Sequence, residues 1–140
     1  ALERAEVRRL VDWFHLRMQG DVTRHLLEEK VYARFRQGGK GPDVDVLRAV
    51  RDNLKYHLSY VDHLAGQRRW LAGEELSFAD LAAAGHLSAA DYLGEIEWAG
   101  LEAARSWYAR MKSRPSLRAI LAERLPGAPT PPPHYADPDF

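Results

Sequence analysis

Six histidines and several acidic side chains could carry chemistry in this sequence, but their spacing matches no catalytic motif. No two histidines lie four residues apart with a glutamate between them, as the zinc-binding H-E-x-x-H pattern requires. His86 lies in an apolar stretch, where we expect a hydrogen-bonded core residue rather than a metal ligand. No serine lies in a G-x-S-x-G turn, although a Ser–His–Asp triad assembled from distant residues stays open. We predict no catalytic residue and no metal site.

The strongest structural signal is a helix start at Ser77. The Ser77 side chain can accept from the first turn as N-cap, and Asp80 can reach back to the Ser77 backbone N–H. Leu76 and Leu81 have the spacing of a hydrophobic staple across this cap. Residues 81–90 then carry no Asp, Glu, Lys or Arg, and a helix that is apolar all round is buried or lies in a membrane. Because the stretch is too short to span a bilayer, we predict a buried central helix over about 77–93.

Amphipathic helices are predicted around this central one, which gives an all-α helical bundle. They are expected over residues 2–36 (one long bent helix or two), 43–66, 100–113 and 115–125, with a solvated turn at 37–42 and a polar turn at 94–100. Four aromatic residues in the first segment are either core or the wall of a pocket: Trp13, Phe14, Tyr32 and Phe35.

Length and charge set further bounds. The chain has 140 residues, 46% of them hydrophobic, which is enough for one domain with its own core over residues 1–125. A formal net charge of zero gives no electrostatic case for nucleic acid, and no apolar run is long enough for membrane insertion. The absence of cysteine excludes disulfides and thiolate chemistry and is compatible with the cytoplasm.

The composition changes at Pro126. Residues 126–140 hold six of the eight prolines and cannot form a helix, so a polyproline II segment is favoured. The segment ends in aromatic and acidic residues, Tyr135, Asp137, Asp139 and Phe140. Three interpretations stay open for this tail: disorder, docking on its own bundle, or a hook for a partner.

The sequence resembles the C-terminal helical domain of the glutathione transferase family. The likeness is carried by W-L-A-G-E before the S-x-x-D cap, by Val11–Phe14, by Ala103–Met111 and by Arg114–Leu117. The resemblance implies that a thioredoxin-like N-terminal domain, which holds glutathione and activates its thiol, is missing. We therefore expect a fragment or processed form that is not an enzyme by itself and holds no cofactor. In the alternative interpretation it is the co-substrate-binding domain of a genuine glutathione transferase, with glutathione held by the missing domain.

The tail narrows the resemblance to the FtsZ-binding, glutathione-transferase-like cell-division proteins of alphaproteobacteria. This likeness implies an interaction protein that binds FtsZ filaments, regulates constriction and lies in the cytoplasm at the division site. The resemblance to the glutathione transferase family also implies that the full-length protein can form a homodimer. The implied partner-binding residues are Tyr135, Asp137, Asp139 and Phe140, with Glu28 and Glu29 as a second surface. Without the resemblance, Glu28 and Glu29 are better interpreted as solvated charge.

Overall fold

The computed structural model describes residues 1–36, 38 and 41–140, and over these residues the fold is all-α. Its helices are α1 (Leu2–Asp12), the π-helix η1 (Trp13–Thr23), α2 (Arg24–Lys30), η2 (Tyr32–Phe35), α3 (Val44–Gln67), α4 (Phe78–Tyr92), α5 (Glu102–Lys112), α6 (Pro115–Ala122) and η3 (Pro133–Ala136). Within this described part there is no strand, only an isolated bridge between Trp70 and Gly73. The predicted fold class is confirmed.

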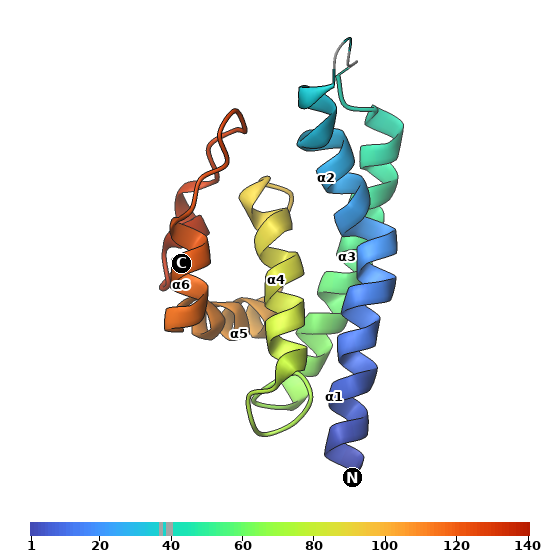
Figure 1. The fold of residues 1–140 in the computed structure, drawn as a ribbon. Helices are drawn as coiled ribbons and strands as arrows, with labels where there is room; N and C mark the ends of the chain where they lie inside the picture. Colours follow the sequence, from blue (N-terminus) through green and yellow to red (C-terminus); the bar gives the residue numbers. More distant parts are fainter. Residues whose placement is uncertain (37, 39–40) are drawn as a thin grey trace.

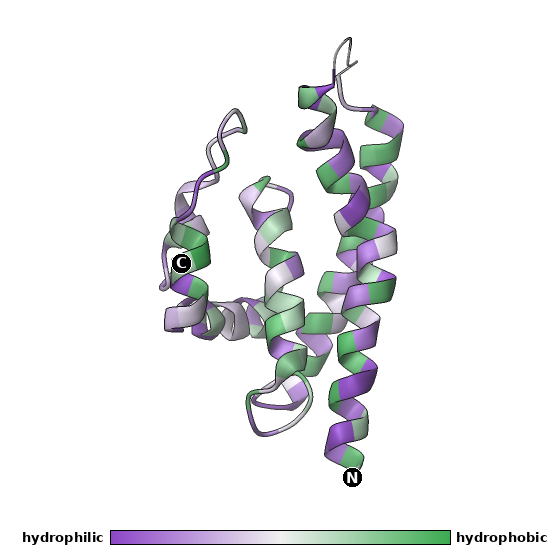
Figure 2. Cartoon of the chain, viewed as in Figure 1, coloured by the Kyte–Doolittle hydropathy of each residue, from purple (hydrophilic) through white to green (hydrophobic). Residues whose placement is uncertain are grey.

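Helix α4 lies in the middle of the bundle, between the α1–α3 helices on one side and α5 and α6 on the other (Figure 1). Within this helix Ala83, Ala84 and Leu87 are fully buried. Figure 2 shows α4 as mostly apolar, whereas α1 alternates between hydrophilic and hydrophobic residues. None of the helices that the structure describes is both long and apolar enough to cross a membrane.

The start of α4 has the predicted capping box. The Ser77 side chain accepts from the Ala79 N–H at 3.2 Å, and the Ser77 N–H donates to Asp80 Oδ2 at 3.0 Å. Asp80 is fully buried and also accepts from the Leu71 N–H at 2.9 Å and from the Trp107 indole N–H at 2.8 Å, both through Oδ1. The cap therefore ties α4 to the preceding loop and to α5.

One strip of α4 is exposed, so the prediction that this helix is buried on all sides is wrong for that strip. Phe78 is 74% exposed and Leu81 is 38% exposed, and Gly85 lies on the same strip. Leu76 packs against the core, so only one member of the predicted staple is well covered. The reason is geometric, because the helices of this chain pack against the other sides of α4 and leave this strip open.

The predicted helix over residues 2–36 is one helical stretch whose middle turns are the π-helix η1. Phe14 is fully buried in the core and Trp13 packs against it, whereas Tyr32 is 52% and Phe35 is 65% exposed. The four aromatic residues are thus not one pocket wall. The turn predicted at 37–42 falls partly on residues 37, 39 and 40, which lie outside the described residues.

Candidate partner-binding surface

The proline-rich tail folds back onto its own bundle beside α6 (Figure 1). Tyr135 is only 4% exposed and packs edge-on against Tyr92 of α4, with ring centroids 5.2 Å apart. Phe140 is partly buried and packs edge-on against Trp98 at 5.4 Å. Of the three interpretations left open for the tail, docking on its own bundle is the one that the structure shows. Tyr135 and Phe140 pack inward as anchors, so neither is a free hook in this conformation, and their contact with a partner stays a prediction.

The two tail carboxylates point to solvent. Asp137 and Asp139 are both exposed, and the Asp139 N–H donates to Asp137 Oδ1 at 2.9 Å. This short-range bond fixes the turn that carries both acids. Of the four predicted tail residues, Asp137 and Asp139 are the ones whose charged groups a partner can reach in this conformation.

A buried polar cluster underlies the tail, and sequence reasoning missed it. Asp91, near the end of α4, is fully buried, and its Oδ1 accepts from the Trp98 indole at 3.0 Å. The same oxygen lies 2.9 Å from His134 Nε2 of the tail. Lys112 of α5 is 1% exposed and donates to the His134 carbonyl at 2.9 Å. Its ammonium also lies 3.6 Å from the centroid of the Phe140 ring, a cation–π contact.

Burial disfavours the charged form of Lys112. Burial lowers the pKa of Lys112 to about 8, against the opposing effect of the nearby Asp91 and Asp137 carboxylates. Around neutral pH the side chain is still mostly protonated, so it can donate to the tail. Residues 94–100 form no helix, in keeping with the predicted turn, but Trp98 within them is only 6% exposed, so the turn is not polar throughout.

Glu28 and Glu29 each have a partner within the chain. Glu28 pairs with Arg36, and the Glu29 carboxylate accepts from the Asp43 N–H at 2.9 Å, at the start of α3. Both residues are of intermediate exposure rather than freely solvated. These two contacts join α2 to the segment that follows it. That Glu28 and Glu29 form a second surface for a partner stays a prediction.

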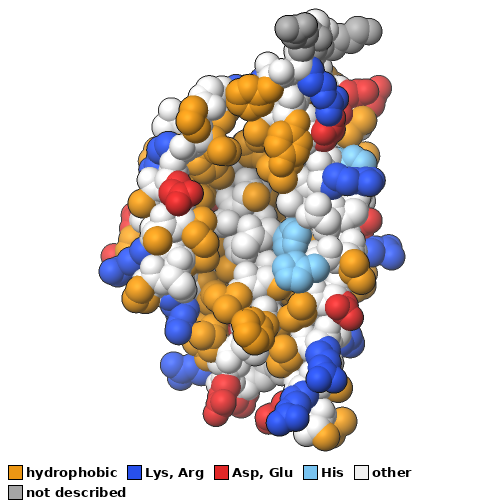
Figure 3. Space-filling model, viewed as in Figure 1, with side chains coloured by type: hydrophobic (Ala, Val, Ile, Leu, Met, Phe, Trp, Pro, Cys, Tyr) orange, Lys and Arg blue, Asp and Glu red, His pale blue; other side chains and the backbone are white. Residues whose placement is uncertain are grey.

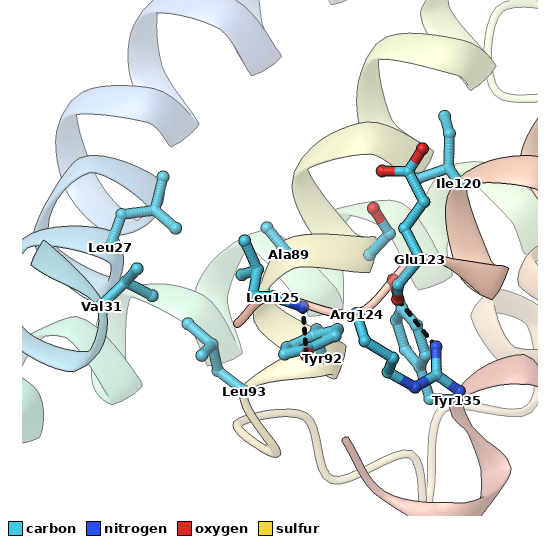
Figure 4. Close-up of a pocket in the computed structure, with 11 residues that line it drawn as sticks. Leu27, Val31, Ala89, Tyr92, Leu93, Ile120, Glu123, Arg124, Leu125 and Tyr135 are labelled. Carbon is cyan, nitrogen blue, oxygen red and sulfur yellow. Dashed lines mark hydrogen bonds between the residues drawn. The ribbon is translucent and has the colours of Figure 1, made fainter. Parts of the chain in front are cut away.

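An apolar cavity of about 230 Å³ opens between α2, α4 and the segment after α6 (Figure 4). Tyr92 lines it, and the Leu125 N–H donates to the Tyr92 hydroxyl at 3.1 Å. Its aliphatic lining is Leu27, Val31, Leu93, Ile120 and Leu125. Figure 3 shows hydrophobic side chains around a hollow on the viewed face. The histidine side chains visible there do not line this cavity, because His15 and His86 line a separate, neighbouring hollow. Such a cavity can hold an apolar group, and Arg124 at its edge can face a polar end.

Two histidines that are far apart in sequence meet beside α4. His15 Nδ1 lies 3.2 Å from His86 Nε2, and Thr23 Oγ1 lies 2.7 Å from His86 Nδ1. Burial lowers the pKa of His86 to about 4, helped by the neighbouring His15 and His57. His86 is therefore a hydrogen-bonded, partly buried histidine, as expected. The described part of the chain has no group of three or more His, Cys, Asp or Glu that could hold a metal ion.

The chain belongs to the glutathione S-transferase family: the model of the C-terminal domain matches residues 29–110. It is similar to FtsZ-localized protein A of Caulobacter vibrioides, with 47% identity over 138 residues, covering 99% of this chain and 60% of the relative. It is also 32% identical to glutathione S-transferase 2 of Saccharomyces cerevisiae over 101 residues, covering 67% of this chain and 43% of that one.

Solved structures agree with this assignment. A glutathione S-transferase from Sinorhizobium meliloti 1021 superposes with a TM-score of 0.94 at 50% identity, covering 99% of this chain and 61% of that one. FzlA from C. crescentus gives a TM-score of 0.94 at 46% identity, covering 100% and 61%. The chain thus spans about 60% of the length of FtsZ-localized protein A, and the resemblance read from the sequence is confirmed.

Proposed function

We propose that this chain is the helical part of a glutathione-transferase-like interaction protein that binds FtsZ polymers and regulates constriction. The observation that carries the proposal is the 47% identity to FtsZ-localized protein A across 99% of the chain, the tail included. The exposed Asp137 and Asp139 are the proposed contact groups, because the other two tail residues are used as anchors. Under this proposal the protein lies in the cytoplasm at the division site.

The proposal extends to the rest of the protein. A thioredoxin-like domain would precede residue 1, residues 1–125 would form the helical domain, and the full-length protein would be a homodimer. The chain itself would hold no cofactor and would not be an enzyme. Light scattering on the full-length protein tests the dimer, and a monomer at micromolar concentration would contradict it.

Co-sedimentation with FtsZ polymers tests the binding. Deleting the tail is a poor test, because deletion strips hydrogen-bond partners from the buried Asp91 and Lys112. Reversing charge at exposed positions is cleaner. We expect the full-length D137K/D139K variant to lose at least tenfold in apparent affinity. The E74K/E75K variant makes the same charge change at two other exposed acids and should pellet like the unmodified protein. Equal pelleting by both variants would refute the tail as the contact.

A second candidate is the co-substrate-binding domain of a genuine glutathione transferase. The apolar cavity beside Tyr92 and the similarity to the yeast transferase favour it. Glutathione would then be bound by the preceding domain. Calorimetry with glutathione and a conjugation assay with a general electrophile decide the matter on the full-length protein. Binding together with turnover would support this second function, whereas the absence of both would remove it.

A further inference from the structure

The tail is held by some of the most deeply buried polar groups of the bundle. Asp91 is fully buried, Lys112 is 1% exposed, and each is bonded to His134 of the tail. Asp91 uses the ring of His134, and Lys112 uses its carbonyl oxygen. One tail residue therefore bridges an acid on α4 and a base on α5.

Helix polarity explains why hydrogen-bond donors and a lysine gather at Asp91. Asp91 lies in the last turn of α4, where the helix dipole places partial negative charge, so a buried carboxylate there is disfavoured. A carboxylate in this position needs donors or positive charge nearby. The Trp98 indole, the His134 ring and the Lys112 ammonium supply them. Releasing the tail would remove one of these donors and leave Lys112 without the acceptor that the structure gives it.

The docked tail presents its carboxylates in a fixed arrangement. Tyr135 and Phe140 are anchored on either side of Asp137 and Asp139, and the bond between the two acids fixes the turn. A group that is ordered before binding loses less conformational entropy when the partner arrives. The same two acids on a free, extended peptide would have to be ordered at that step.

We propose that Asp91, Lys112 and His134 form a latch that holds the tail as a folded ridge, and that the partner binds Asp137 and Asp139 only in this docked arrangement. The inference rests on the proposed function and assigns the partner a surface with positively charged side chains. Asp91 and Lys112 are buried, so they act as positioning residues and do not touch the partner themselves.

Three variants of the full-length protein test the latch. H134A removes the ring that faces Asp91, and K112M removes the ammonium while keeping a long side chain suited to a buried site. H134Q is the rescue variant, because a glutamine amide can donate to Asp91 in place of His134 Nε2. All three keep Asp137 and Asp139.

Amide hydrogen exchange over residues 134–139 reports tail release without any partner present, and co-sedimentation with FtsZ polymers reports binding. We expect H134A and K112M to speed exchange in the tail at least tenfold and to weaken binding at least fivefold. H134Q should stay near the unmodified protein in both measurements. Unchanged exchange in H134A and K112M would overturn the latch.

Two further outcomes separate this inference from the proposed function. A synthetic peptide of residues 126–140 that binds as tightly as the protein would overturn the need for docking. Faster exchange with unchanged binding would overturn it as well, while leaving FtsZ binding in place. If the unmodified protein does not bind the polymer at all, the proposed function fails, and hydrogen exchange alone still decides whether the tail is latched.

Discussion

Replacing Asp80 by alanine should destabilise the bundle far more than removing the N-cap hydroxyl beside it. The Asp80 carboxylate is fully buried and accepts three hydrogen bonds, from Ser77, Leu71 and Trp107. Each hydrogen bond to a charged group contributes roughly 1.5–3 kcal/mol, and the three are not additive. The Asp80→Ala variant leaves all three donors without this acceptor, so we expect a loss of about 4 kcal/mol.

Ser77→Ala is the matched comparison. The Ser77 hydroxyl accepts one bond, from the Ala79 N–H at 3.2 Å, and removing an N-cap costs about 1 kcal/mol. Urea unfolding of both variants, followed by circular dichroism, gives the two free energies directly. A domain of this size is typically stable by about 5–15 kcal/mol. The Asp80→Ala variant should therefore keep a measurable unfolding transition if the unmodified protein lies high in this range, and be mostly unfolded if it lies at the low end. Equal losses in the two variants would refute a role for Asp80 beyond the cap.

Three other substitutions test the pH response and the core. Glu6→Gln should lower the free energy of unfolding by about 1 kcal/mol at pH 7, because hydrogen bonds to Arg9 and Arg68 lower the pKa of Glu6 to about 2. This difference between the variant and the unmodified protein should vanish as the pH falls from 4.5 towards 2. Because the pKa of His86 is lowered to about 4 in the folded state, the free energy of unfolding should decrease as the pH falls from 6.5 to 4. In urea titrations at several pH values, His86→Gln should reduce this decrease by roughly 2–3 kcal/mol. Leu87→Ala removes a fully buried side chain and should cost about 3 kcal/mol in urea unfolding; a cost below about 1 kcal/mol would contradict its place in the core.

The cap of α4 could be predicted because its chemistry is local. Ser77 and Asp80 are three residues apart, and the pattern that joins them depends only on helix geometry. The third partner of Asp80 could not be foreseen, since Trp107 lies 27 residues away and reaches the carboxylate only through the packing of α5. Local signals thus predicted where α4 starts. Tertiary packing determines how many hydrogen bonds, and therefore how much stability, depend on Asp80.

The tail shows the opposite case. Its composition predicted an extended, proline-rich segment, but the direction in which its aromatic side chains point depends on residues elsewhere. Asp91 lies 43 residues from His134, and Lys112 lies 22 residues from it. A buried lysine and a buried aspartate are visible in the sequence only as ordinary charged residues. The one available signal was Asp91 itself, a charge that follows ten residues without Asp, Glu, Lys or Arg.

The two buried aspartates of α4 predict different responses to the same substitution. At Asp80 both carboxylate oxygens accept backbone or indole donors, so the amide group of Asn must face one of those donors. At Asp91 both bonds go to Oδ1, and Oδ2 is buried with no hydrogen-bond partner among the described residues. An asparagine there can keep both bonds and removes a charge from the negative end of the helix dipole, but it also removes the carboxylate that stabilises the buried Lys112 ammonium.

We therefore expect Asp80→Asn to cost about 2–3 kcal/mol in urea unfolding. Asp91→Asn should cost only about 1 kcal/mol, because the gain at the helix dipole and the loss of the charge facing Lys112 oppose each other. The two substitutions change the same atoms at similar burial, so each is the control for the other. Because Asp91→Asn keeps the acceptor for His134, it should leave the tail docked, in contrast to His134→Ala. If Asp91→Asn costs as much as Asp80→Asn, then the charge of Asp91, rather than the position of one oxygen, stabilises this end of the helix.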